Sequence, residues 1–217
     1  MKTLIDLHNH TVASGHAYST VEELISRAKR RLKVLGISDH TPAMPGGANL
    51  LHFANLFVIP REVDGLILLK GAEANILDLE GSIDMPEDIL ERLDYVIASL
   101  HPPCVNPGTK EENTDAILKI MKNPYVQIIG HPDDSRYPLD YDTLVQASKQ
   151  YNVALEINNA SLRPDGYRQG VYENNTTILK LCKKYGVKVI FGSDSHISYD
   201  VADFSNCIQI AEEVNFP

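Results

Sequence analysis

Short apolar runs alternate with amphipathic stretches along the whole chain. The apolar runs lie at residues 4–7, 34–38, 66–75, 95–100, 126–130, 153–158 and 187–191. They are continuous rather than alternating, as is typical of parallel strands buried on both faces. Helical patterns are predicted between them, at residues 113–122, 141–151, 174–185 and 203–214, with a further helix starting near residue 19. Repeated strand–helix units predict a parallel α/β fold, either an open doubly wound sheet or a closed barrel.

Two local signals mark helix ends. Ser19 and Glu22 have the spacing of a capping box, which predicts the start of the first helix. Gly186 stands where a helix C-cap is expected. No glycine-rich phosphate loop follows a predicted strand, which counts against a dinucleotide-binding sheet.

Polar residues follow seven of the predicted strands. From His10 onward they recur every 27–36 residues, at His40, Glu73, His101, His131, Asn158 and Asp194. In a β/α barrel the carboxyl ends of the strands form one rim, where active sites lie, whereas an open sheet would spread these groups along a line. The pattern therefore favours the barrel.

The chemistry of this rim points to metal ions. His8 and His10 form a His-x-His pair whose imidazoles lie on the same side of a strand, because side chains alternate with a period of two. Imidazole and carboxylate without thiolate suit Zn, Mn or Fe. His52 lies outside this set, and we interpret it as packing or lining a loop. Residues 42–57 are predicted to be loop, forming either a wall or lid over the site or structural filler.

Six segments together resemble the PHP (polymerase and histidinol phosphatase) family, and within it the YcdX-like phosphatases. They are DLHNHTVASGHAYST, ISDHTP, GAEANI, HPDD, ALEINN and GSDSHI, in order from residue 6 to 197. The resemblance implies a distorted (β/α)7 TIM-like barrel that holds three divalent ions, with Zn expected and Mn or Fe as alternatives. It also implies a closing segment after the last helix, which this chain lacks in our interpretation because it stops at Pro217.

The resemblance implies nine metal ligands. The first ion would take His8, His10, Glu73 and Asp194; the second Glu73, His101 and His131; and the third His16, His40 and His196. Glu73 would bridge the first two. The expected activity is hydrolysis of small phosphomonoesters by a metal-bridged hydroxide, in line and without a phospho-enzyme.

Further roles are predicted for other rim residues. Glu73 and Asp194 would serve catalysis as ligands, and Asp39, or a water on the third ion, would be the general acid. Arg163, Arg168 and Asn158 follow the sixth strand and would bind the substrate phosphate, because arginine pairs bidentately with phosphate. A solvated loop charge is the alternative for each arginine.

Composition narrows the class of protein. The 217 residues suffice for a single domain spanning residues 1–217, and a formal net charge of −9 argues against nucleic-acid or anionic-membrane partners. Three cysteines without short spacing and no signal-like N-terminus predict a cytoplasmic protein with reduced thiols. The resemblance also allows a homotrimer.

Two other enzyme classes stay open. The same family contains phosphodiesterases and nucleases, which the acidic charge and short length disfavour. Amidohydrolases also use His-x-His, often with a carbamylated lysine as bridge. Lys70 is three residues before Glu73 and so faces the other side of the strand.

Overall fold

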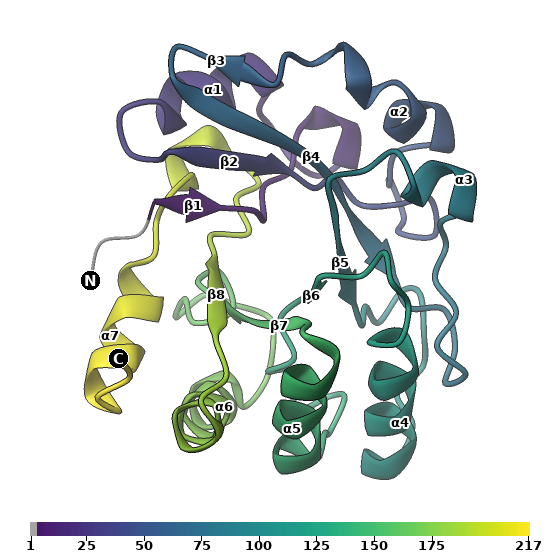
Figure 1. Ribbon diagram of the computed structural model, residues 1–217, viewed down its shortest axis with the longest axis vertical. Helices are drawn as coiled ribbons and strands as arrows, with labels where there is room; N and C mark the ends of the chain where they lie inside the picture. The colour runs from purple at the N-terminus through teal and green to yellow at the C-terminus, as the bar shows by residue number, and fades with distance from the viewer. Residues whose placement is uncertain (1–3) are drawn as a thin grey trace.

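A nearly closed barrel of parallel strands forms the centre of the molecule (Figure 1). The computed structural model describes residues 4–217. The strands run in the order β1 (Ile5–Asp6), β2 (Val34–Ile37), β4 (Leu66–Asn75), β5 (Tyr95–Ser99), β6 (Ile128–Ile129), β7 (Ala154–Asn158) and β8 (Val189–Gly192). A parallel bridge between Asn9 and Ser195 links the first and last strands beyond their ends. The predicted distorted seven-stranded barrel is confirmed.

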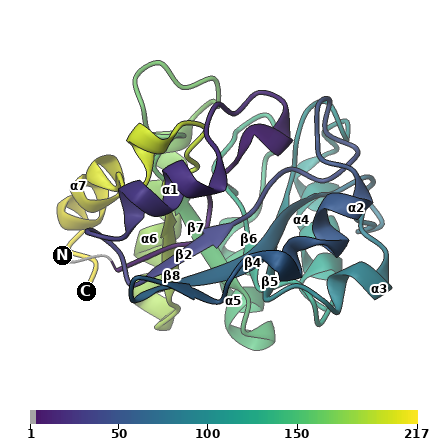
Figure 2. The same ribbon diagram turned by 90° about the horizontal axis from the view of Figure 1, so that it is seen from above.

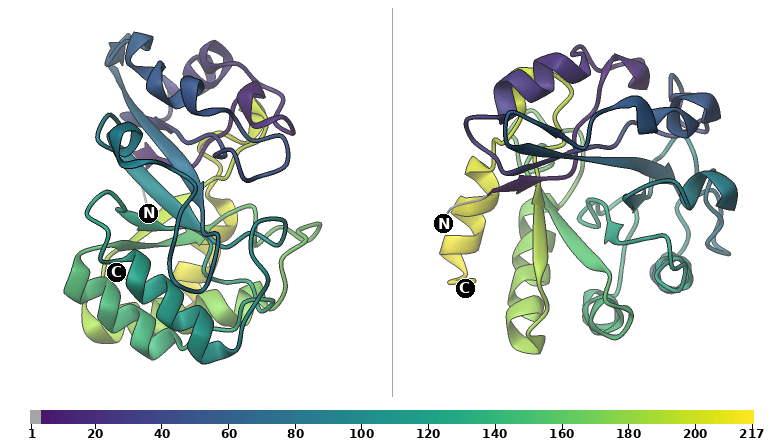
Figure 3. Two further views of the ribbon diagram at one scale, coloured as in Figure 1. Left: turned by 90° about the vertical axis from the view of Figure 1, so that its right-hand side faces the viewer. Right: turned by 45° about the horizontal axis from the view of Figure 1, so that its top comes forward.

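Helices cover the outside of the barrel. They are α1 (Val21–Ala28), α2 (Leu50–Ala54), α3 (Glu87–Leu90), α4 (Lys110–Ile120), α5 (Tyr141–Tyr151), α6 (Val171–Tyr185) and α7 (Ser205–Glu213). Figure 3 shows α4, α5 and α6 as a row on one side, with α1 and α2 on the other. No helix within residues 4–217 has the length and apolar character needed to cross a bilayer.

Some elements differ from the prediction. The short helix α2 lies inside residues 42–57, which were expected to be loop, and α3 and the antiparallel strand β3 (Glu62–Val63) were not predicted. The capping box is formed by Thr20 and Glu23, one residue later than expected. The hydroxyl of Ser19 instead accepts a hydrogen bond from the backbone N–H of Ser198 at 2.8 Å.

Strand β4 shows how the barrel separates its two faces. Leu66, Leu68 and Ala72 face outward into the large core beneath the helices. Leu69 faces inward, where a smaller cluster formed by Tyr95, Ile97 and Ile128 fills the barrel. Because side chains alternate along a strand, Glu73 points inward like Leu69, at the carboxyl end of the barrel.

A tyrosine fills the barrel because two glycines leave room for it. The Tyr95 hydroxyl donates to the carbonyl of Leu7 at 2.6 Å. A Cβ at Gly36 would lie 2.1 Å from that hydroxyl oxygen, and one at Gly71 would lie 2.4 Å from the ring. The space above this plug, at the carboxyl ends of the strands, is left to polar side chains. Figure 2 shows the loops after β1 and β7 rising on the same side of the barrel.

Candidate metal centre

All nine predicted ligands converge at the carboxyl end of the barrel. Seven of them are buried: His8, His10, His40, Glu73, His101, His131 and Asp194. His196 is half-buried and His16 is exposed, so these two lie at the mouth. The outer position, that of the predicted third-ion ligands His16, His40 and His196, therefore lies nearer the mouth than the inner pair formed by the other ligands, although His40 itself is buried.

Glu73 stands at the centre of the inner part. Its Oε1 lies 2.8 Å from His131 Nε2 and 3.2 Å from His101 Nε2. Its Oε2 lies 3.2 Å from His8 Nε2 and 2.8 Å from His40 Nδ1. The two oxygens thus face different sets of imidazoles, which is the geometry a bridging carboxylate needs.

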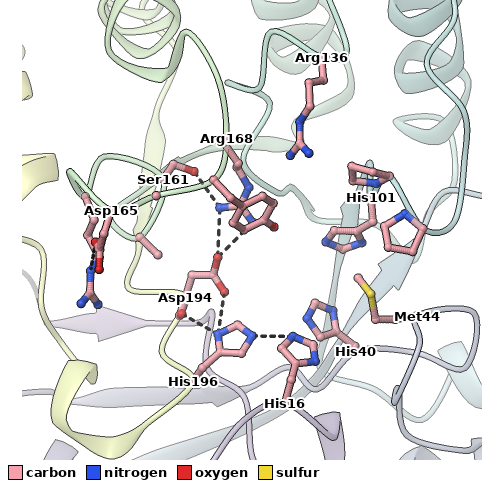
Figure 4. Close-up of a pocket in the computed structure, with 16 residues that line it drawn as sticks. His16, His40, Met44, His101, Arg136, Ser161, Asp165, Arg168, Asp194 and His196 are labelled. Atoms are coloured by element: carbon pink, nitrogen blue, oxygen red, sulfur yellow. Dashed lines mark hydrogen bonds and ion pairs between the residues drawn. The ribbon is translucent and has the colours of Figure 1, made fainter.

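Asp194 connects the inner and outer parts. Its Oδ1 lies 3.3 Å from His10 Nε2 and 3.5 Å from both His8 Nε2 and His196 Nδ1. The Nε2 atoms of His196 and His16 lie 3.1 Å apart (Figure 4). His196 thus contacts both Asp194 and His16, which connects the imidazoles at the mouth to the buried ligands.

Two of the ligand positions carry unusual backbone geometry. Asp194 has φ 54° and His131 has φ 28°, both in the left-handed region. Such conformations cost free energy in residues other than glycine, and they concentrate at functional sites. Both residues direct their side chains to the other ligands from this backbone conformation.

The donor atoms that face the centre have no other partner. Within residues 4–217 no hydrogen bond reaches five of these buried atoms: His8 Nε2, His10 Nε2, His40 Nδ1, His101 Nε2 and Glu73 Oε2. Buried polar atoms without partners are costly. Three sets bring their ligand atoms within 4.8 Å of one another: His8–His10–Glu73, His10–His40–His196 and His40–Glu73–His101. The residues therefore fit divalent metal ions such as Zn.

The electrostatics of the site prepare most of these groups for metal. Burial lowers the pKa of His10 to about 3 and that of His101 to about 4, so both are neutral near pH 7. Burial would raise the pKa of Glu73, but the charges of His8 and His40 outweigh it and hold that pKa well below its usual value. Neutral imidazole and ionised carboxylate are the forms that bind metal.

His8 is the exception. Burial lowers its pKa, but the charges of Glu156, Glu73 and Asp194 outweigh burial and raise it well above its usual value. A metal ion at His8 Nε2 would take the place of a proton, because these acidic groups favour a cation there.

Glu156 orients His8. Its Oε1 lies 2.7 Å from His8 Nδ1, and its Oε2 accepts the backbone N–H of His131 at 2.8 Å. A carboxylate on one ring nitrogen directs the other toward a metal. The sequence analysis had noted the ALEINN segment without giving Glu156 a role.

Asn75 and Asp84 orient His101 in the same way, and the sequence analysis missed both. Asn75 Oδ1 accepts from His101 Nδ1 at 2.8 Å, and Asn75 Nδ2 donates to Asp84 at 2.8 Å. The position of Asn75, two residues after Glu73 on the same strand face, was the available signal.

The three predicted substrate-binding residues have different surroundings. The buried guanidinium of Arg168 donates to Asp194 Oδ2 at 3.2 Å, beside the ligand set. Arg163 is instead paired with Asp200 at 2.8 Å. Asn158 is buried, and its Nδ2 donates to Asp194 at 3.2 Å. Both arginines line the cavity, and Arg168 is the one that contacts a predicted ligand.

Asp39, the predicted general acid, lies behind the ligands rather than in the cavity. Its carboxylate is buried and accepts hydrogen bonds from the backbone and hydroxyl of Thr11 and from the Ser14 hydroxyl. His52 Nε2 lies 3.2 Å from Asp39 Oδ2. Both side chains therefore belong to the support of the site.

A cavity of about 570 Å³ opens over the outer ligands. Five predicted ligands form its base: His16, His40, His101, Asp194 and His196. Met44, Pro102, Tyr167 and Arg168 are among its walls. Figure 4 shows Arg136 extending toward the open centre of this cavity.

Comparison with solved structures supports the fold. A crystal structure of histidinol phosphate phosphatase from Lactococcus lactis, in complex with Zn, L-histidinol and phosphate, has a TM-score of 0.65 and 18% identity, covering 99% of this chain and 95% of that one. An archaeal ribonuclease P chain, from a structure with mature tRNA, has a TM-score of 0.55 and 14% identity, covering 98% of this chain and 91% of that one. At these identities the likeness shows a shared barrel fold.

Comparison with curated proteins shows closer relatives. No family model matches the chain. A probable phosphatase of Clostridium novyi is 48% identical over 218 residues, covering 100% of this chain and 88% of the relative. A probable phosphatase of Caldicellulosiruptor saccharolyticus is 48% identical over 214 residues, covering 98% and 88%. The chain therefore belongs to the family of these bacterial probable phosphatases.

Proposed function

We propose that the protein is a metal-dependent phosphatase that hydrolyses small phosphomonoesters at a centre of three divalent ions. The observation that carries the proposal is the convergence of nine imidazole and carboxylate side chains, five of whose buried atoms have no hydrogen-bond partner within residues 4–217. The phosphatase family of its relatives supports the same activity. We place the chain in the YcdX-like part of the PHP family and expect zinc as the metal.

The inner residues would hold two ions through one carboxylate. Glu73 faces His101 and His131 with Oε1 and His8 with Oε2. When bound, such ions supply a hydroxide nucleophile near neutral pH and offset the charge of the phosphate. The buried side chains fix the ligand positions before substrate arrives, so little reorganisation is needed.

Arg168 would help to hold the phosphate. Its guanidinium contacts Asp194 at 3.2 Å and the Ser161 hydroxyl at 2.8 Å. Burial would lower the pKa of Arg168, but the charge of Asp194 outweighs it and raises that pKa above its usual value. A permanent cation beside the ligand set attracts an anion to a protein whose net charge is −9.

The cavity and the position of Lys70 separate this proposal from its alternatives. A cavity of about 570 Å³ accommodates a small molecule. Because side chains alternate along β4, Lys70 lies on the same outward face as Leu66 and Leu68. It is therefore not placed to bridge two metals as a carbamylated lysine would. An amidohydrolase is thereby disfavoured.

The test uses the full chain stripped of metal with a chelator and reconstituted with Zn, Mn or Fe(II). We expect hydrolysis of p-nitrophenyl phosphate and other monoesters only after reconstitution, with three ions bound per chain. The absence of metal-dependent monoester hydrolysis across a broad panel would refute the proposal. Preferred degradation of single-stranded DNA would favour a nuclease instead.

A further inference from the structure

A buried carboxylate behind the ligands is shared by several loops. Asp39 Oδ1 accepts the backbone N–H of Thr11 at 2.7 Å and the hydroxyl of Ser14 at 2.7 Å. Its Oδ2 accepts the Thr11 hydroxyl at 2.8 Å and lies 3.2 Å from His52 Nε2. Asp39 therefore joins the turn after β1 to helix α2, although neither element contains it.

Ser14 transmits this contact to the ligands. Because its single hydroxyl proton goes to Asp39, the Ser14 oxygen acts as acceptor for the backbone N–H of His40 at 3.0 Å. The same oxygen lies 3.3 Å from His10 Nδ1. The Ser14 carbonyl accepts the backbone N–H of His16 at 2.8 Å. Two outer ligands, His16 and His40, thus depend directly on Ser14.

The turn between Ser14 and His16 has no room to adjust. Gly15 has φ 68°, and a Cβ there would lie 2.6 Å from the carbonyl oxygen of Gly46. The backbone of the turn is therefore pressed against the loop after β2. A change in the Asp39 contact would move His16 as a unit with this turn.

His52 is the imidazole that lies beside the Asp39 carboxylate. Helix α2 begins at the N-cap Asn49, whose side chain accepts the backbone N–H groups of Leu51 and His52. The His52 ring reaches back from this helix, and its buried Nε2, which makes no hydrogen bond within residues 4–217, lies 3.2 Å from Asp39 Oδ2. A buried carboxylate needs such a partner.

The inner ligands have supports of their own. His8 rests on Glu156 and His101 on Asn75, and neither support has a hydrogen bond to Asp39 among the described residues. Only His10, among the inner ligands, touches the Ser14 hydroxyl, and its distance of 3.3 Å is the longest in that network.

We propose that His52 is a positioning residue for the outer metal position, formed by His16, His40 and His196, and that it acts through Asp39 and Ser14. It sets the affinity for one ion of three and leaves the inner pair nearly unchanged. The inference rests on the proposed three-ion centre. It assigns a role to the histidine that sequence analysis had placed outside the ligand set.

The experiment compares His52→Leu, which removes the donor, with His52→Gln, which retains one. Leu51→Ala is the matched control, because Leu51 is an exposed neighbour on the same helix. Each full chain is dialysed against chelator-buffered zinc over a range of free concentrations, and bound zinc is counted by elemental analysis. Thermal unfolding of each metal-free variant is recorded in parallel.

We expect His52→Leu to lower the affinity for one of the three zinc ions by about 10–100-fold, which is the usual effect of removing a residue that supports a metal ligand. His52→Gln should recover most of this affinity, and Leu51→Ala should match the wild type. Wild-type affinity for all three ions in His52→Leu would overturn the inference, as would a parallel loss of all three.

A wild type that binds only one or two ions would refute the three-ion proposal itself, which distinguishes the two failures. If His52→Leu does not fold, a His52→Gln variant with wild-type affinity for all ions supports the donor role, and one that weakens the inner pair contradicts it.

Discussion

Gly192 packs so closely against Glu156 that we expect a single added methyl group to disturb the metal site. This residue ends β8, and a Cβ there would lie 1.8 Å from Glu156 Oε1. Its φ lies outside the left-handed region, so alanine suits the backbone and the effect is steric. To reach an ordinary contact of 3.4 Å the Glu156 oxygen must retreat by about 1.6 Å.

That oxygen holds His8 in place. It lies 2.7 Å from His8 Nδ1, and the same carboxylate accepts the backbone N–H of His131. Loss of a hydrogen bond to a charged group costs about 1.5–3 kcal/mol. Loss of a support for a metal ligand weakens metal binding by about 10–100-fold. Gly192→Ala should therefore lower both the stability of the metal-free protein and the zinc affinity of the inner pair.

The assay is zinc binding in chelator buffers together with thermal unfolding. Gly186→Ala is the control: Gly186 has φ 67° and nothing within 4 Å of its virtual Cβ, so it should lose stability through backbone strain alone and keep its zinc affinity. A Gly192→Ala protein with wild-type zinc affinity and unchanged melting temperature would show that Glu156 does not fix His8 as argued.

Four further predictions address the site and the barrel. Glu73→Gln should abolish binding of both inner ions and all phosphatase activity, as measured by elemental analysis and p-nitrophenyl phosphate hydrolysis; retained activity would refute the bridging role. Arg168→Lys should raise KM about tenfold with little change in zinc content, because lysine keeps a cation beside Asp194 but cannot pair bidentately with phosphate; an unchanged KM would exclude phosphate contact. Zinc at 100 times its Kd should stabilise the metal-free protein by about 2.7 kcal/mol for each ion bound, visible in denaturant titration, and no shift would contradict a folded-state site. Gly71→Ala should cost about 1–3 kcal/mol through collision with Tyr95 while zinc stoichiometry stays unchanged.

The parts of the fold that sequence analysis predicted well are those fixed by burial. Strand β4 was predicted with its observed bounds, and helix α5 likewise. A continuous apolar run is buried as a strand, and a long amphipathic period is buried as a helix, so each pattern determines the type of element. The polar residue at each strand end then follows from topology.

The parts that were missed depend on contacts distant in sequence. Helix α2 has only 5 residues, too few for a hydrophobic period, and it is held by its cap Asn49 and by packing. The capping box lies one residue later than predicted because Ser19 and Thr20 each precede a glutamate by three positions. The contact between Ser19 and Ser198 decides between them, and no local pattern reveals it.

The same reasoning explains why the spacing of polar residues indicates most of the ligands but not their grouping into separate ions, which only the family resemblance implied. Spacing along the chain indicates which strand delivers a side chain, whereas grouping depends on distances between strands. His40 shows the difference: its Nδ1 lies 2.8 Å from Glu73 Oε2, yet its ring stacks on that of His16, with centroids 5.0 Å apart. It can therefore serve either the inner or the outer position. Zinc binding by His40→Ala, compared with His16→Ala, decides between them, since loss of the same single ion in both variants places His40 in the outer set and loss of an inner ion in His40→Ala places it with Glu73.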